Sequence, residues 1–240
     1  MRKKLSSRFW LSCCLILLLC PAVIWLCARS GGRSFYVSAL LMICCTIAAF
    51  FFAFEARKPQ AREVVILAVL CALAVASRAA LIAVPNFKPM TAIVMIAGIA
   101  LGPEAGFLTG AISGFASNFI FGQGPWTPWQ MFAYGFAGFL FGLLARLKLL
   151  PRKPVPLAIC GFAAVVILIG PMLDTCALFI MSGVINAETA ATVYLAGIPV
   201  NLIHASATGL TLLLFSKPLL DRLARIQLKY GLMEDNGDAL

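Results

Sequence analysis

Five polar side chains interrupt long apolar runs in this sequence. They supply a guanidinium, a carboxylate, an imidazole and two carboxamides, from Arg78, Asp174, His204, Asn118 and Asn201. Such groups are costly inside a membrane, so they commonly mark ligand, ion or proton sites. We therefore expect all five to face the interior of a helical bundle and to contribute to a substrate-binding site.

A stiff loop follows the first of the two carboxamides, Asn118. Its sequence, FIFGQGPWTPWQ, combines glycine and proline in a pattern typical of a fixed turn. The loop carries two amides and two indoles, from Gln123, Gln130, Trp126 and Trp129. Indoles can stack on a flat ligand while amides bind its edges, but tryptophan also serves as an anchor at a membrane surface. We include all four as candidate substrate-binding residues.

Purely structural roles are open for the same polar residues. Arg78 and Asp174 could pair as a salt bridge within the bundle. His204 could be a core histidine with its hydrogen bonds satisfied, and Asn201 could simply join two helices. The argument for a site is their shared depth, because in the predicted topology all five fall in the outer half or the middle of the membrane.

The composition requires a lipid environment. Hydrophobic residues make up 62% of the 240 residues and charged residues 12%, whereas soluble domains carry about 25% charged residues. Only helices and closed barrels satisfy the backbone in lipid, and continuous apolar runs near 20 residues favour helices. We predict an all-α, polytopic membrane protein with spans at 9–27, 35–54, 64–84, 90–101, 105–121, 129–147, 155–181 and 191–215.

The distribution of basic residues predicts the orientation. With the N-terminus in the cytoplasm, fifteen of the 19 lysines and arginines fall in cytoplasmic segments, as the positive-inside rule requires. Both termini are then cytoplasmic in a bacterial cell membrane, and nucleic acid is not an expected partner. The first apolar segment is read as an uncleaved helix. The charged segment 55–63 divides the chain into a two-helix appendage, 1–58, and a six-helix core with a short basic tail, 59–240.

Small residues form two stripes with a spacing of four. One comprises Ala68, Ala72, Ala76 and Ala80. At about 100° per residue these alanines cover roughly 120° of the helix, and Arg78 lies roughly 140° from their centre. If Arg78 points inward, the alanines face outward, towards lipid or another subunit. The glycines at 98, 102, 106, 110 and 114, with Gly138 and Gly142, favour internal packing, and Pro103 should break the helix there.

The sequence lacks the signatures of several other activities. No GxxxxGK[ST] phosphate loop is present, so energy for transport would come from a partner or an ion gradient. Most of the nine cysteines lie in apolar runs, where thiols behave as small hydrophobes, and no cysteine–histidine spacing suggests a metal. We expect no metal, no cofactor and no ATPase activity of its own.

The core, residues 60–220, resembles the substrate-binding S component of energy-coupling factor (ECF) transporters. The resemblance rests on the six spans, the segment LAVLCALAVASRAAL with its alanine stripe, the short second helix and the segment SNFIFGQGPWTPWQ. It implies high-affinity capture of a vitamin or related micronutrient outside the cell. It also implies docking, through Ala68, Ala72, Ala76 and Ala80, on a membrane coupling subunit that carries two ATPase subunits. The additional helices at 1–58 depart from the six-span plan of the family.

Two other functions stay open on the sequence alone. A self-sufficient secondary transporter or channel would need no ATPase partner, although no internal repeat of the kind seen in such folds is evident. An intramembrane serine protease of rhomboid type could use Ser113 with His204, but Ala111 stands where the GxSG pattern has glycine. The ligand itself could be a vitamin, a corrinoid or a nucleobase-like precursor.

Overall fold

The computed structural model describes residues 60–151, 153–182 and 185–230, with a few single positions between 40 and 51. The chain divides into two compact units, Met1–Lys58 and Pro59–Leu240. The predicted spans 9–27 and 35–54 lie outside the described residues except for those single positions. The described part of the second unit is helical and contains no strand, in agreement with the predicted all-α fold.

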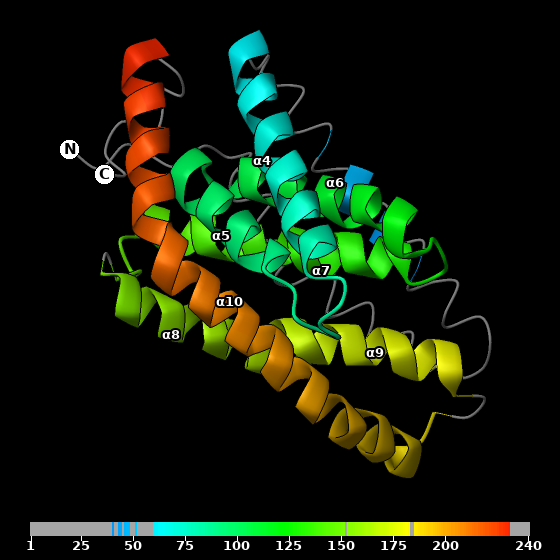
Figure 1. Ribbon diagram of the computed structural model, residues 1–240. Helices are drawn as coiled ribbons and strands as arrows, with labels where there is room; N and C mark the ends of the chain where they lie inside the picture. Colours follow the sequence, from blue (N-terminus) through cyan, green and yellow to red (C-terminus); the bar gives the residue numbers. More distant parts are fainter. Residues whose placement is uncertain are drawn as a thin grey trace. The chain divides into compact units, whose positions relative to one another are not determined.

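The second unit is built from helices of very different lengths (Figure 1). They are α4 (Ala61–Ala80), α5 (Met90–Leu101), α6 (Pro103–Phe121), α7 (Thr127–Arg146), α8 (Pro154–Ala164), α9 (Gly170–Met181) and α10 (Ala187–Tyr230). Among the described residues, α4, the continuous segment Pro154–Met181 and α10 are long and apolar enough to cross a membrane, and α5 is a shorter apolar helix.

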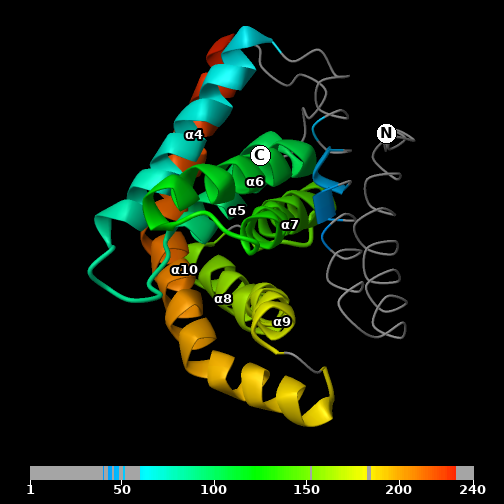
Figure 2. The same ribbon diagram turned by 90° about the vertical axis from the view of Figure 1, so that its right-hand side faces the viewer.

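Helix α5 forms the centre of the bundle. Its residues from Met90 to Gly98 are all buried, on every side of the helix, and it packs against α4, α6, α7 and α10. Figure 2 shows α4 and α10 on one side of the group formed by α5, α6 and α7. With 12 residues, α5 is about 18 Å long, shorter than the roughly 30 Å of a bilayer core. It can be short because protein surrounds it.

Glycines bring α5, α6 and α7 into backbone contact. A Cβ atom added to Gly98 would lie within 3 Å of the Gly138 backbone, and one added to Gly106 would lie 2.6 Å from the Gly138 carbonyl oxygen. The predicted break is also present, since Gly102 adopts a φ of 94° and α6 begins at Pro103. The glycine stripe therefore packs helices together, as predicted.

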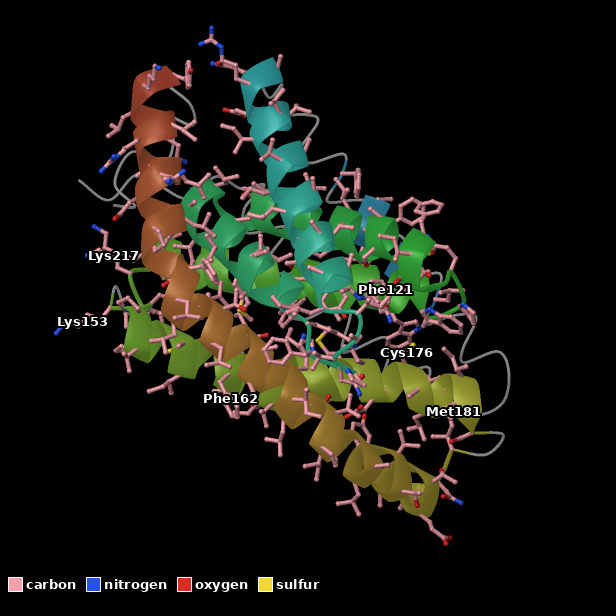
Figure 3. The ribbon with its side chains drawn as sticks, viewed as in Figure 1. Phe121, Lys153, Phe162, Cys176, Met181 and Lys217 are labelled. Atoms are coloured by element: carbon pink, nitrogen blue, oxygen red, sulfur yellow. The ribbon has the colours of Figure 1, made fainter. Side chains whose placement is uncertain are left out.

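The last two helical segments form an antiparallel pair. A π-helical turn, Val165–Ile169, joins α8 to α9 without a break, and α10 returns along both. Figure 3 shows Lys153 and Lys217 near one end of this pair and Met181 near the other. Helix α10 is 44 residues long and extends beyond the predicted span 191–215 at both ends. It bends near Pro218, and its basic terminal part continues as a helix that buries Leu223.

The orientation of α4 agrees with the prediction from helical spacing. Arg78 is buried, whereas Ala68, Ala72, Ala76 and Ala80 are all exposed on the opposite face. The helix ends at Ala80, earlier than the predicted residue 84. Between α4 and α5 the chain forms turns, and Asn86 adopts a φ of 61° there.

Candidate functional site

A network of buried polar groups forms where α4 and α6 end and α7 begins. Arg78 donates from Nη1 to the hydroxyl of Ser117 and, at 3.2 Å, to Oδ1 of Asn118. Asn118 in turn donates to Oγ1 of Thr127 at 3.2 Å and to Oε1 of Gln130 at 2.9 Å. We call these five residues the arginine network. It brings together three of the predicted site residues, Arg78, Asn118 and Gln130.

The guanidinium of Arg78 is held on one face by an aromatic ring. Its Cζ lies 4.1 Å from the centre of the Phe121 ring, a geometry in which the ring quadrupole attracts the cation. Phe121 is the last residue of α6 and is labelled in Figure 3. Arg78 is only 7% exposed, and among the described residues no carboxylate pairs with it. The alternative role left open for Arg78, a salt bridge with Asp174, is not formed.

The loop between α6 and α7 is held by its own hydrogen bonds. Thr127 donates to Oε1 of Gln123 at 2.8 Å and accepts from the Gly124 N–H at 3.1 Å. Gln123 also donates to the Phe115 carbonyl, and the indole of Trp126 donates to the Gly122 carbonyl at 3.3 Å. The loop is thus a fixed turn, as expected. Gln123 and Trp126 are exposed at its surface.

Asp174 and Asn201 form a second polar group, between α9 and α10. Asn201 donates from Nδ2 to Oδ2 of Asp174 at 2.7 Å. One helical position further along α9, the hydroxyls of Thr175 and Tyr194 lie 2.7 Å apart. Asn201 is buried and Asp174 half-buried. The nine predicted site residues therefore do not share a single hydrogen-bonded cluster.

His204 occupies a third position, in the core. Its Nε2 lies 2.7 Å from Oγ1 of Thr91, and its ring meets that of Tyr134 edge to face, with centres 6.2 Å apart. His204 is buried beside α5. Because Nε2 is engaged by Thr91 and no hydrogen bond links His204 to Ser113, the described structure does not assemble the serine–histidine dyad of a protease.

Several buried donors lack a partner among the described residues. They are Nε of Arg78, Nε1 of Trp129 and the hydroxyls of Ser113 and Tyr134. Trp129 packs against Phe179 of α9, with ring centres 5.5 Å apart. A buried donor left unpaired costs about 1–3 kcal/mol. Hydrogen-bond acceptors supplied from outside the described chain would offset that cost.

Sequence reasoning missed the hydroxyl residues of these groups. Ser117, Thr127 and Thr91 lie in helices, and nothing in their local sequence distinguishes them from other serines and threonines. A better signal was available on the last two helices. Gly170 and Gly197 each stand four residues before a polar member of the second group, a spacing that places glycine and polar side chain on one face.

Comparison with protein-family models identified a family that this chain matches. A model described as the S component of the ECF-type riboflavin transporter matches residues 58–221. The chain belongs to this family. It is therefore an ECF S component, a transport subunit and not an enzyme. Comparison with curated proteins and with solved structures gave no match. The match begins just before α4 and ends within α10, so it covers every polar group described above.

Proposed function

We propose that this S component captures a flat, acceptor-rich vitamin or vitamin precursor outside the cell and delivers it through an ATP-driven ECF importer. The observation that carries the proposal is the state of Arg78. A cation buried in a membrane bundle is expensive unless it is paired. Here, among the described residues, it has amide and hydroxyl partners and one unpaired donor, Nε. Ligand carbonyl, carboxylate or phosphate oxygens would complete this environment.

The remaining candidate residues suit the other parts of such a ligand. Trp129 and Trp126 offer aromatic surfaces, and Gln123 and Gln130 offer amides for a heterocycle's edge. Asp174 and Asn201 offer an acceptor and a donor, while His204 supports the core beside them. Riboflavin is the first ligand to test, because the matching family carries its name and its ring system has both acceptor oxygens and a flat face.

Orientation and partners follow from surface features. The excess of lysine and arginine in one set of loops supports cytoplasmic termini and a ligand site that opens outward. The exposed face formed by Ala68, Ala72, Ala76 and Ala80 supports docking on a membrane coupling subunit, since small residues allow close helix approach. Two ATPase subunits bound to that partner would supply the energy.

A ligand-binding titration tests the capture proposal. The full chain is purified in lipid nanodiscs, and quenching of riboflavin fluorescence is measured for the parent and for Arg78→Lys. We expect submicromolar binding by the parent and at least a tenfold loss in the variant, because lysine lacks the planar, multi-donor geometry of arginine. Arg222→Lys, at an exposed position of α10, is the matched control and should bind normally.

Two results would count against the proposal. One is the absence of any vitamin-like molecule among compounds that co-purify with the chain, together with no riboflavin binding. The other is equal affinity of the parent and Arg78→Lys. Uptake into proteoliposomes by the chain alone, without ATPase subunits, would instead support the secondary-transporter alternative.

A further inference from the structure

The helix that carries Asp174 contains one irregular turn. Val165–Ile169 is π-helical, and the Gly170 N–H bonds to the carbonyl of Val165, five residues back. Val165 and Ile169 are fully buried, while Ile167 is 68% exposed. A π-turn contains one residue more than a turn of regular α-helix, and such turns are frequent at functional sites.

Two glycines flank the Asp174–Asn201 hydrogen bond in a reciprocal arrangement. A Cβ atom on Gly170 of α9 would lie 2.5 Å from Cγ of Asn201, and one on Gly197 of α10 would lie 2.5 Å from both carboxylate oxygens of Asp174. Each helix thus offers a glycine to the polar side chain of the other. We call these four residues the glycine–polar clasp. Its formation requires a fixed rotation of α9 relative to α10.

The preceding helix, α8, also faces α10. The Ala158 carbonyl oxygen would lie 3.5 Å from a Cβ on Gly209, and a Cβ on Gly161 would lie 2.2 Å from Leu212. Suppose that α8 and α9 formed one uninterrupted α-helix with about 100° of rotation per residue. The face that carries Gly170 and Asp174 would then point roughly 170° away from the face that carries Ala158 and Gly161. One inserted residue reduces this angle to roughly 70°.

We propose that the π-turn is a one-residue insertion that keeps the clasp in register, and so positions Asp174 and Asn201 for the ligand. This inference rests on the proposed function for the identity of the ligand. The turn itself touches no ligand in this scheme. It acts by letting α8 and α9 both pack on α10, which a regular α-helix with the same number of residues would not allow.

The inference makes an unusual prediction about chain length. Deleting Ile167 converts the π-turn into a regular α-turn and leaves the rotation of α9 unchanged. Inserting one alanine after Ile167 adds a second surplus residue and rotates α9 by about 100°. We expect the deletion to bind riboflavin within about threefold of the parent, as should the control Ile167→Ala, and the insertion to bind at least tenfold more weakly.

A cross-linking readout is independent of the ligand. In Asp174→Cys/Gly197→Cys, the two Cβ atoms would lie within about 4 Å of each other, because Cγ of Asp174 is 2.6 Å from a Cβ at position 197 and a C–C bond adds about 1.5 Å, which suits a disulfide. Oxidation of the full chain in nanodiscs measures the bond, with peptide mapping to separate it from bonds to native cysteines and with controls that carry only one of the two substitutions. We expect it in the parent and the deletion background, and at least a tenfold lower yield in the insertion background.

The two readouts separate the register from the ligand. Loss of the cross-link on deletion of Ile167, or full retention on insertion, overturns the inference whatever riboflavin does. Equal riboflavin affinity in the parent and the insertion chain, with the cross-link lost only in the latter, overturns the positioning role. A parent chain that cross-links as expected but binds no riboflavin defeats the proposed ligand, and leaves the register itself supported.

Discussion

The contact between α6 and α7 gives a sharp stability prediction. A Cβ atom on Gly138 would lie 2.2 Å from the carbonyl oxygen of Gly106 and 2.5 Å from its carbonyl carbon. Both are backbone atoms within helices, so no side chain can move aside. Gly138→Ala must therefore separate the two backbones by roughly 1 Å to restore normal van der Waals contact.

The magnitude follows from two opposing effects. Overpacking of a well-packed interior costs about 1–3 kcal/mol, and this site should be at the upper end because both partners are backbone. Alanine recovers up to about 1 kcal/mol of helix propensity over glycine. We expect a net loss of about 2 kcal/mol, which corresponds to a Tm lower by roughly 4–8 °C for a chain of this size.

Thermal unfolding in detergent, followed by fluorescence-detected size-exclusion chromatography, measures the shift. Gly209→Ala is the matched control, because the nearest atom to a Cβ there is 3.5 Å away, an ordinary contact. This variant should be as stable as the parent or slightly more so. If Gly138→Ala and Gly209→Ala melt together, the close backbone approach of α6 and α7 is not a real constraint, and the packing argument fails.

Two further predictions address the loop and the exposed face. Thr127→Val should lower the free energy of unfolding by about 1–3 kcal/mol, because Asn118 and the Gly124 N–H each lose an acceptor; Thr192→Val, whose hydroxyl bonds only to its own helix, should change it little in the same melting assay. Ala72→Trp should leave riboflavin binding and Tm unchanged but abolish transport when the coupling and ATPase subunits are present, and normal transport by this variant would argue against docking on that face.

Much of the fold was predictable because membrane helices obey simple rules. The apolar runs predicted helices, Gly102 and Pro103 marked the break between α5 and α6, and helical spacing placed Arg78 inside with the alanines outside. The length of α10 was not predicted. Its last part is polar enough to read as a tail, and it makes tertiary contacts that the sequence does not reveal, including the bond from Gln227 to the Ala100 carbonyl at 2.9 Å.

The sequence predicted only in part which residues come together in each polar group. Depth in the membrane selected Arg78 and Asn118 together, and the structure joins them by a hydrogen bond. Membrane depth could not show that Asp174 would accept a hydrogen bond from Asn201 and not pair with Arg78, because the partner of Asp174 depends on how α9 is rotated. In a chain of this length the rotation of α9 depends on the π-turn, whose sequence, VVILI, is indistinguishable from any other apolar stretch.

The position of α5 has a consequence for how the protein is made. A twelve-residue helix is too short to be held across a bilayer by lipid alone, and one of its faces is covered by α10, which is synthesised after the other helices that pack on α5. The centre of the bundle therefore cannot be completed until α10 has been translated. Until then α5 lies in a partly assembled bundle. If the ribosome stalled before α10 was made, a bundle with an incomplete core would remain in the membrane.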